Sequence, residues 1–221
     1  GSNRLADIAR AEMKIALVID DASRPTPVKE IIPALLSELA LAGVVKEQIT
    51  LIPAVGLHRR MEETELCDRV GAQAFSGMKW INPDCDDAQT LTFLGTTKRG
   101  TPVWLCKTVA EADLVISVGC IEPHIIASFG GGYKNIVPGV AGRITTAHNH
   151  SLNCSPKTYN NVGLSIDQNP MRLDLEEAGR MLKGRVFIVN TILNFRLELV
   201  RLVAGDGVAA HREGVRVSGG L

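Results

Sequence analysis

Short apolar runs rich in β-branched residues recur along the chain, and stretches with helical periodicity separate them. Between the first two runs, residues 27–42 place their apolar side chains on one helical face, and Gly43 would end the helix. Strands that alternate with helices form parallel sheets, because each crossover returns the chain to the same end of the sheet. We therefore predict an α/β fold with a mainly parallel sheet flanked by helices. The expected buried strands are residues 13–19, 48–54, 114–118 and 185–193.

Weaker patterns complete this prediction. Residues 151–170 have no periodicity and are rich in Asn and Ser, which predicts a long loop or lid of the kind that is more often functional than idle. Gly1 and Ser2 are typical of a tag remnant, and residues 217–221 do not finish an element, so we expect a fragment of a longer protein. The remaining expected elements are strands at 90–94 and 102–105 and helices at 4–11, 62–70, 107–112, 143–148, 171–182 and 206–216.

Charge balance and cysteine usage exclude several classes of protein. The chain has 24 basic and 24 acidic residues, so its net charge favours neither nucleic acid nor an anionic membrane surface. Its five cysteines are odd in number and lack C-x-x-C spacing, which argues against a disulfide framework and favours a reducing cytoplasm. No apolar run reaches the roughly 18 residues of a membrane span. We expect a cytoplasmic protein without a nucleic-acid or membrane partner.

Three polar clusters follow predicted strands, and ligands of open α/β sheets bind beyond the carboxyl ends of the strands. The first cluster, residues 20–27, contains Asp21, Ser23 and Arg24. Ser23 could cap the next helix, which would be a structural role. Alternatively, Arg24 and the amino end of that helix would bind a phosphate or carboxylate. The local pattern leaves both interpretations open.

The second and third clusters contain histidines. His58 lies in a Gly-Leu-His-Arg-Arg segment, and a lone loop histidine is usually an ordinary surface residue. The third cluster joins Glu122 and His124 to a glycine-rich loop that ends at Lys134. Its spacing is neither that of a Walker A loop nor that of a dinucleotide-binding loop. A flexible turn seldom keeps a glutamate, a histidine and a lysine together, so a functional site is favoured here.

Two other histidines, His148 and His150, lie two positions apart. On a helix they would point roughly 200° apart and could not share a ligand, and then one of them could bind a metal while the other is ordinary. On an extended segment they would share a face and, with His58 and His124, would suggest a zinc site. His211 lies among alanines on the last predicted helix and is expected at the surface.

In order and spacing, these segments resemble the motifs of the nickel-pincer lactate racemases. Ten positions separate His124 from Lys134 and sixteen separate Lys134 from His150, as in that family. The resemblance extends from Leu5 to His211. The matching segments are Asp-x-Ser-Arg-Pro-x-Pro at 21–27, Gly-Leu-His-Arg at 56–59, Glu-x-His at 122–124 with the loop to residue 134, Pro-Gly-Val at 138–140 and Asn-His at 149–150.

The resemblance implies a nickel-pincer nucleotide cofactor, the nickel complex of pyridinium-3,5-bisthiocarboxylic acid mononucleotide. Lys134 matches the lysine that bonds to this group, and His150 matches the protein ligand of its nickel. Sulfur donors with one imidazole suit the ligand preferences of nickel. His148 has no counterpart role in the family. The residues that match the nucleotide-holding segment are Asp21, Ala22, Ser23 and Arg24.

The implied activity is that of a racemase or epimerase of a 2-hydroxy acid, such as lactate. In the family, a hydride passes to the cofactor ring while a base takes the hydroxyl proton, and a transient 2-keto acid forms. The hydride returns to the opposite face, so one base is needed for each enantiomer. His58 and His124 match the paired acid–base histidines, and the pKa of histidine near neutrality suits proton transfer in both directions.

The sequence departs from the family pattern at two places. Ala22 stands where the family has a larger residue, and Ser128 and Gly130 stand where it often has Gly and Ser. The second departure is expected to alter the pocket wall near His124. The family also has a C-terminal domain with more substrate contacts. The resemblance therefore implies that residues 3–217 are the N-terminal, cofactor-holding domain of a two-domain protein, with the C-terminal domain as its partner. The alternative to a racemase is a non-catalytic α/β module that binds an anion or zinc.

Overall fold

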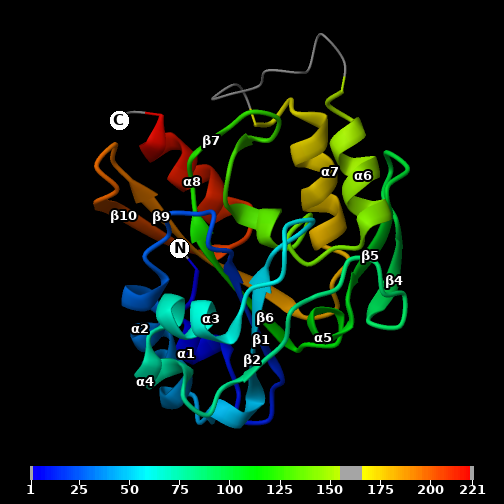
Figure 1. The fold of residues 1–221 in the computed structure, drawn as a ribbon. Helices are drawn as coiled ribbons and strands as arrows, with labels where there is room; N and C mark the ends of the chain where they lie inside the picture. Colours follow the sequence, from blue (N-terminus) through cyan, green and yellow to red (C-terminus); the bar gives the residue numbers. More distant parts are fainter. Residues whose placement is uncertain (1, 155–165, 220–221) are drawn as a thin grey trace.

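The computed structural model describes residues 2–154 and 166–219. At its centre is a six-stranded sheet in which neighbouring strands are parallel except at one edge, where β10 runs antiparallel to β9 (Figure 1). The four predicted buried strands are all present, which confirms the mainly parallel α/β fold. From one edge to the other the strands are β10 (Leu199–Asp206), β9 (Arg185–Leu193), β6 (Leu114–Cys120), β1 (Ile15–Asp20), β2 (Ile49–Ala54) and β3 (Lys79–Trp80).

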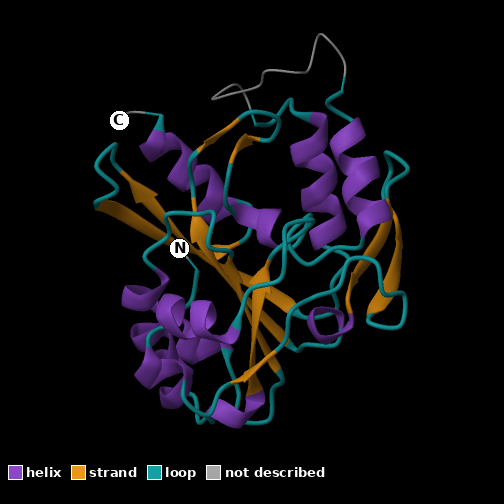
Figure 2. Ribbon diagram, viewed as in Figure 1, coloured by secondary structure: helices purple, strands orange, loops and turns teal. Residues whose placement is uncertain are grey.

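Helices cover both faces of this sheet (Figure 2). They are α1 (Leu5–Ile8), α2 (Val28–Leu41), α3 (Glu63–Val70), α4 (Ala72–Phe75), α5 (Lys107–Ala110), α6 (Arg143–Ser151), α7 (Pro170–Gly179) and α8 (Ala209–Ser218). Alternate side chains of a strand point to opposite faces. Accordingly, Leu17 of β1 packs in a core with α1 to α4, whereas Val18 packs in a second core with α5 and α7. None of the helices within the described residues combines the length and apolar character that crossing a membrane requires.

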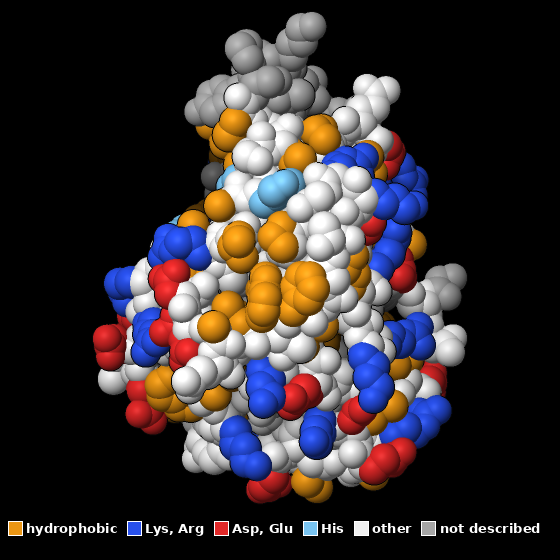
Figure 3. Space-filling view, turned by 90° about the vertical axis from the view of Figure 1, so that its right-hand side faces the viewer, with side chains coloured by type: hydrophobic (Ala, Val, Ile, Leu, Met, Phe, Trp, Pro, Cys, Tyr) orange, Lys and Arg blue, Asp and Glu red, His pale blue; other side chains and the backbone are white. Residues whose placement is uncertain are grey.

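The predicted strands at residues 90–94 and 102–105 form a separate antiparallel pair, β4 (Leu91–Thr96) and β5 (Pro102–Cys106). Figure 3 looks onto the side of the molecule where this pair lies, and hydrophobic side chains gather on that surface. The backbone N–H of Trp104 in β5 donates to Oγ1 of Thr145 at 2.9 Å. The pair therefore braces α6, which is the helix that carries His150.

Strand β10 is the clearest element that the sequence does not predict. It lies at the sheet edge with Leu199 and Arg201 exposed, so it lacks the continuous buried apolar run of the inner strands. The last helix consequently begins at Ala209, after β10 ends, rather than at residue 206. Most of the predicted lid at 151–170 lies outside the described residues. Ser151 is the last residue of α6 and Pro170 the first of α7, and the described residues between them, 152–154 and 166–169, form turns or coil.

Candidate active site

A cavity of about 370 Å³ lies at the carboxyl ends of three neighbouring strands, β2, β1 and β6. Ligands of open α/β sheets bind at this position. Side chains reach the cavity from the segments that follow each strand, and Thr146 and His150 of α6 complete its wall. Because the three strands are adjacent in the sheet, residues far apart in the sequence meet here.

Six of the eight predicted site residues line this cavity, and two do not. Ala22 and Ser23 are exposed, and Ala22 borders a separate surface depression at the amino end of α2. A turn accounts for their position, because Oδ1 of Asp21 accepts hydrogen bonds from the backbone N–H and the hydroxyl of Ser23 at 3.0 and 2.5 Å. The lining residues are Asp21, Arg24, His58, His124, Lys134 and His150.

Neither local interpretation of the first polar cluster holds in full. Ser23 does not cap α2, whose N-cap is Pro27 without any side-chain cap. The amino end of α2 borders the separate depression instead of the cavity. Arg24 does reach the cavity, where its guanidinium lies 2.6 Å from Oε1 of Glu122. An anion that binds Arg24 would share it with this carboxylate.

His58 and Asp21 form a hydrogen-bonded pair at the cavity. Nδ1 of His58 lies 2.5 Å from Oδ2 of Asp21. Burial raises the pKa of the Asp21 carboxyl, but hydrogen bonds from Ser23 and His58 outweigh that effect and hold the pKa below its ordinary value. An ionised Asp21 accepts the Nδ1 hydrogen, which leaves the lone pair of the neutral ring on Nε2. Asp21 is thus placed to orient His58.

His124 and Lys134 form a second pair with an informative proton arrangement. Nδ1 of His124 accepts the backbone N–H groups of Ile126 and Ala127 at 3.3 and 3.2 Å, so the neutral ring carries its hydrogen on Nε2. This Nε2 lies 2.6 Å from Nζ of Lys134. The amine must then accept the hydrogen bond with a lone pair, which requires it to be uncharged.

Electrostatics agree with an uncharged Lys134. Burial is the largest cause that lowers its pKa well below the ordinary value, and the charges of Arg172 and Arg24 act in the same direction. Burial likewise lowers the pKa of His124 to about 3. The side chain of Lys134 is surrounded by protein atoms, but it remains partly accessible to solvent because it lines an open cavity. An uncharged amine in such a place is a nucleophile.

The two histidines of α6 point to different surroundings. Nδ1 of His150 donates to the carbonyl oxygen of Thr146 at 2.9 Å, so the neutral ring, which lines the cavity, keeps its lone pair on Nε2. Burial lowers the pKa of His150. Nδ1 of His148 instead lies 2.8 Å from Oγ1 of Thr101. The helical interpretation is correct, and one unprotonated imidazole nitrogen is available to a transition metal.

The zinc site considered from the sequence is wrong. Within residues 2–154 and 166–219, a single set of three His, Cys, Asp or Glu side chains has donor atoms within 4.8 Å of one another, and it contains no histidine. That set is Asp84, Cys85 and Asp86. Arg143 already pairs with Asp86 at 2.6 Å. The histidines of the cavity therefore do not converge on a common ion.

The surface position predicted for His211 is also wrong. The residue is fully buried, and its Nε2 lies 2.7 Å from the carbonyl oxygen of Gly130 in the cavity wall. A signal was present in the sequence, because Val208, His211 and Val215 share the spacing of one helical face. Arg172 of α7 is likewise fully buried, and no sequence pattern indicated its position.

Only one of the two substitutions in the glycine-rich loop alters the pocket wall. Gly130 lines the cavity, as expected. Ser128 does not; it is buried behind the wall, where its hydroxyl accepts from Nδ2 of Asn169 at 3.0 Å. Its φ of 62° lies in the left-handed region that favours glycine, which fits the family preference for Gly at this position.

Asp20 links the site to the pH dependence of stability. Its buried carboxylate accepts from the hydroxyl of Thr26 and pairs with Arg69. Burial nevertheless outweighs these contacts and raises its pKa from 3.8 to about 6. The folded protein therefore binds this proton more tightly than the unfolded chain. The resulting stabilisation is complete below about pH 4 and is lost as the pH rises through about 6.

We therefore expect Asp20→Asn to remove one pH-dependent contribution to the free energy of unfolding. The free energy of unfolding of the wild type minus that of the variant should fall by about 2–3 kcal/mol between pH 4 and pH 7. Urea denaturation at unit pH intervals measures this difference. The exposed Asp68→Asn is the matched control and should follow the wild type. A difference that stays constant with pH for Asp20→Asn would contradict the expectation.

Comparison with known proteins gives this geometry a family context. A family model described as the lactate racemase N-terminal domain matches residues 1–161. Lactate racemases of Lactiplantibacillus plantarum and Thermoanaerobacterium thermosaccharolyticum are 32% and 28% identical over 217 and 214 residues. Each match covers 97% of this chain and 50% of the relative, so the chain spans about half the length of these relatives.

Solved structures agree. The lactate racemase apoprotein of Thermoanaerobacterium thermosaccharolyticum superposes with a TM-score of 0.87 at 27% identity, over 98% of this chain and 51% of that chain. A Thermotoga maritima protein shares the fold with a TM-score of 0.80 at 21% identity, over 98% and 57%. All eight predicted site residues lie within the range of the family model, whereas Arg172 and His211 lie beyond it.

Proposed function

This chain belongs to the family of lactate racemase N-terminal domains, and from that membership we propose that it is the cofactor-holding part of an enzyme that racemises lactate or a related 2-hydroxy acid. The observation that carries the proposal is the hydrogen bond from His124 to an uncharged Lys134 in a cavity that also contains His58 and His150. Burying an amine without an opposite charge beside it costs free energy of folding. A purely structural role for Lys134 does not explain that cost. Further contacts to the substrate would come from a region that corresponds to the other half of the longer relatives.

Three groups of the cavity fit a nickel-pincer nucleotide. Lys134 offers the amine lone pair needed for a covalent bond to a thiocarboxyl-derived carbon. His150 offers Nε2 of a neutral imidazole to nickel, and Arg24 offers a positive charge to the phosphate. When bound, this cofactor would supply the hydride acceptor for the carbon that is inverted. Ser23 then contributes indirectly, through the turn that orients Asp21.

His58 is suited to take the hydroxyl proton of the substrate. Asp21 fixes the Nδ1 hydrogen, so Nε2 carries the lone pair that accepts the proton. The carboxylate also stabilises the imidazolium that results. In the reverse direction the same Nε2 would give the proton back to the substrate oxygen. This arrangement uses the ordinary chemistry of a histidine–carboxylate pair.

His124 begins from the opposite proton state. Its Nε2 hydrogen is donated to the lone pair of Lys134, and a lysine nitrogen bonded to the cofactor would no longer offer that lone pair. The Nε2 hydrogen would then be available to the substrate oxygen. To act as a base, His124 would have to move its hydrogen to Nδ1, at the cost of two backbone hydrogen bonds. We therefore propose unequal roles, with His58 as the stronger base and His124 chiefly a donor.

We place the enzyme in the cytoplasm. All five cysteines are free thiols, and a reducing compartment keeps them so. Burial raises the pKa of Cys120, which lines the cavity, to about 12. This thiol therefore stays uncharged at neutral pH and does not compete with Lys134 as a nucleophile.

Elemental analysis and intact-mass measurement of the complete protein from its native host test the proposal. We expect nickel equimolar with protein and a covalent adduct on the peptide that contains Lys134. Chiral chromatography should also detect interconversion of the lactate enantiomers. A non-catalytic anion-binding module is the second candidate, favoured by Arg24 at the cavity. Phosphate binding without nickel, adduct or turnover would support that candidate and contradict the racemase.

A further inference from the structure

The glycine-rich loop, residues 127–132, connects the segment of His124 to Lys134 and forms part of the cavity wall. Its backbone is unusual, with left-handed φ values of 62° at Ser128 and 71° at Gly131. A left-handed residue other than glycine costs free energy, so such a loop must be held by its surroundings. A Cβ atom on Gly131 would lie 2.8 Å from Oδ1 of Asn190, which shows how closely the backbone is packed.

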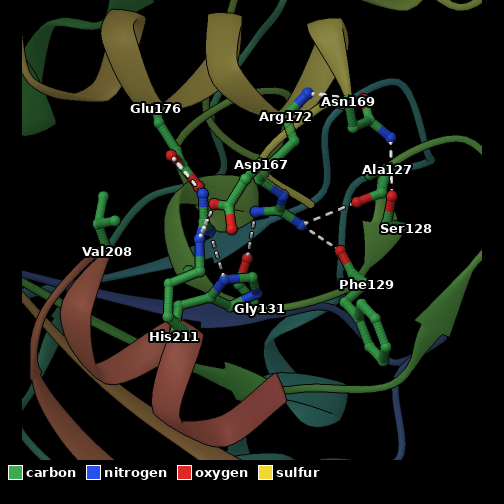
Figure 4. Close-up of polar contacts among 12 residues, drawn as sticks. Ala127, Ser128, Phe129, Gly131, Asp167, Asn169, Arg172, Glu176, Val208 and His211 are labelled. Atoms are coloured by element: carbon green, nitrogen blue, oxygen red, sulfur yellow. Dashed lines mark hydrogen bonds and ion pairs between the residues drawn. The ribbon is translucent and has the colours of Figure 1, made fainter. Parts of the chain in front are cut away.

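Arg172 of α7 holds this loop from behind the cavity wall. Its guanidinium donates to the carbonyl oxygens of Gly131 at 3.2 Å, of Phe129, and of Ala127 at 3.5 Å. These are every second carbonyl of the segment, and in Figure 4 all three meet the guanidinium. The planar fork of an arginine can serve several acceptors at once, which a lysine ammonium does less well.

The buried environment of Arg172 is energetically unfavourable for a charged side chain. Burial lowers its pKa to about 10, so the group is still a cation at neutral pH. Within the described residues no carboxylate lies at ion-pair distance, because Glu176 pairs with Arg212 instead, and Nε has no hydrogen-bond partner. Buried cations are usually paired with anions. An apolar side chain would fill the same space at less cost, which points to a role beyond packing.

His211 of α8 holds the loop at one more point. Its Nε2 donates to the carbonyl oxygen of Gly130 at 2.7 Å, and its Nδ1 lies 3.3 Å from the guanidinium of Arg212. Burial is the largest cause that lowers the pKa of His211 well below its ordinary value, so the ring is neutral and Nδ1 can accept. Arg212 is itself fixed by Glu176 at 2.7 Å. The loop carbonyls are therefore clamped by α7 and α8 together.

We propose that Arg172 and His211 are positioning residues, which fix the carbonyl groups of the glycine-rich loop and thereby hold Lys134 in its uncharged pairing with His124. This inference rests on the proposed function of Lys134 as the residue that bonds to the cofactor. Neither residue lines the cavity, so neither touches the reacting groups. The charge of Arg172 adds to the effect, since after burial it is the next cause that lowers the pKa of Lys134.

The test is the acetylation of Lys134 in the complete protein, produced in a host that does not make the cofactor. Acetic anhydride labels uncharged amines, and peptide mass spectrometry compares Lys134 with the exposed Lys107 of the same molecule. In Arg172→Met the pH profile of Lys134 labelling should shift to higher pH, and labelling at pH 7.5 should fall, because a neighbouring positive charge that disfavours the charged amine is removed. Arg172→Lys, which retains the charge, should restore most of the labelling.

A second pair of variants keeps the inference testable if Arg172→Met fails to fold. His211→Gln retains a donor for the Gly130 carbonyl and should label like the wild type, whereas His211→Leu should label more slowly. Reduced free energy of unfolding with an unchanged pH profile of Lys134 in both Arg172→Met and His211→Leu would overturn the proposal. Because labelling needs neither nickel nor substrate, its outcome is independent of the nickel and adduct analysis of the wild type.

Discussion

A complete enzyme in which methionine replaces Lys134 is expected to lose racemisation of lactate by about 10³-fold or more, the order of loss seen when a nucleophile is removed from an active site. Methionine fills similar space without an amine, so the cavity keeps its shape while the covalent bond to the cofactor cannot form. Chiral chromatography of lactate measures turnover, and intact mass shows whether the adduct is absent. Both signals should disappear together.

Lys107→Met is the matched control, because Lys107 is an exposed lysine on α5 outside the cavity. It should retain wild-type turnover and adduct. Lys134→Arg is a second informative variant, since a guanidinium keeps its charge and cannot become the uncharged nucleophile. We expect it to be as inactive as Lys134→Met. Full turnover in either variant of Lys134 would exclude a covalent role for this residue.

His58→Gln and His124→Gln are expected to differ strongly, although both replace a histidine of the same cavity. Glutamine cannot act as a base, so His58→Gln should lower kcat by about 10²–10⁴-fold. At the second position the glutamine amide can still donate a hydrogen bond in place of Nε2–H. His124→Gln should therefore remain within about tenfold of the wild type, the order expected for one altered hydrogen bond.

His124→Leu separates the two roles of that histidine, because leucine removes the donor as well as any basic nitrogen. It should be clearly less active than His124→Gln when lactate turnover is followed from each enantiomer. If His124 were instead the obligatory base for one enantiomer, glutamine and leucine would be equally inactive in that direction. Equal losses for glutamine and leucine would therefore contradict the unequal roles proposed here.

The inner part of the fold was predictable because its signal is local. Strands β1, β2, β6 and β9 are buried on both faces, so each appears in the sequence as an apolar run. Strand β10 has no such run because solvent reaches its first half, and β3 contains two residues only. Strands β4 and β5 pair with each other outside the main sheet. This pairing depends on where the chain turns, and the pattern of apolar residues does not predict it.

The site was predictable where it follows strands and unpredictable where it depends on packing. Residues after β1, β2 and β6 meet because the carboxyl ends of parallel strands share one edge. Ser23 does not form the helix cap that was one of its two possible roles, because its hydroxyl is bound by Asp21 and is thus unavailable to α2. Arg172 and His211 reach the loop only through the packing of α7 and α8, which spacing in the sequence does not specify.

The hydrogen bond from the backbone N–H of Gly132 to Oδ1 of Asn190, at 2.8 Å, has a consequence for biosynthesis. The glycine-rich loop is made well before β9, and His211 follows later still. A ribosome must therefore synthesise nearly all of the described chain before the loop has its supports, since parallel strands pair only after long segments are complete. The proposed bond between Lys134 and a cofactor would therefore form after translation, because a nascent chain that ends before α8 lacks the contacts of His211 with the loop.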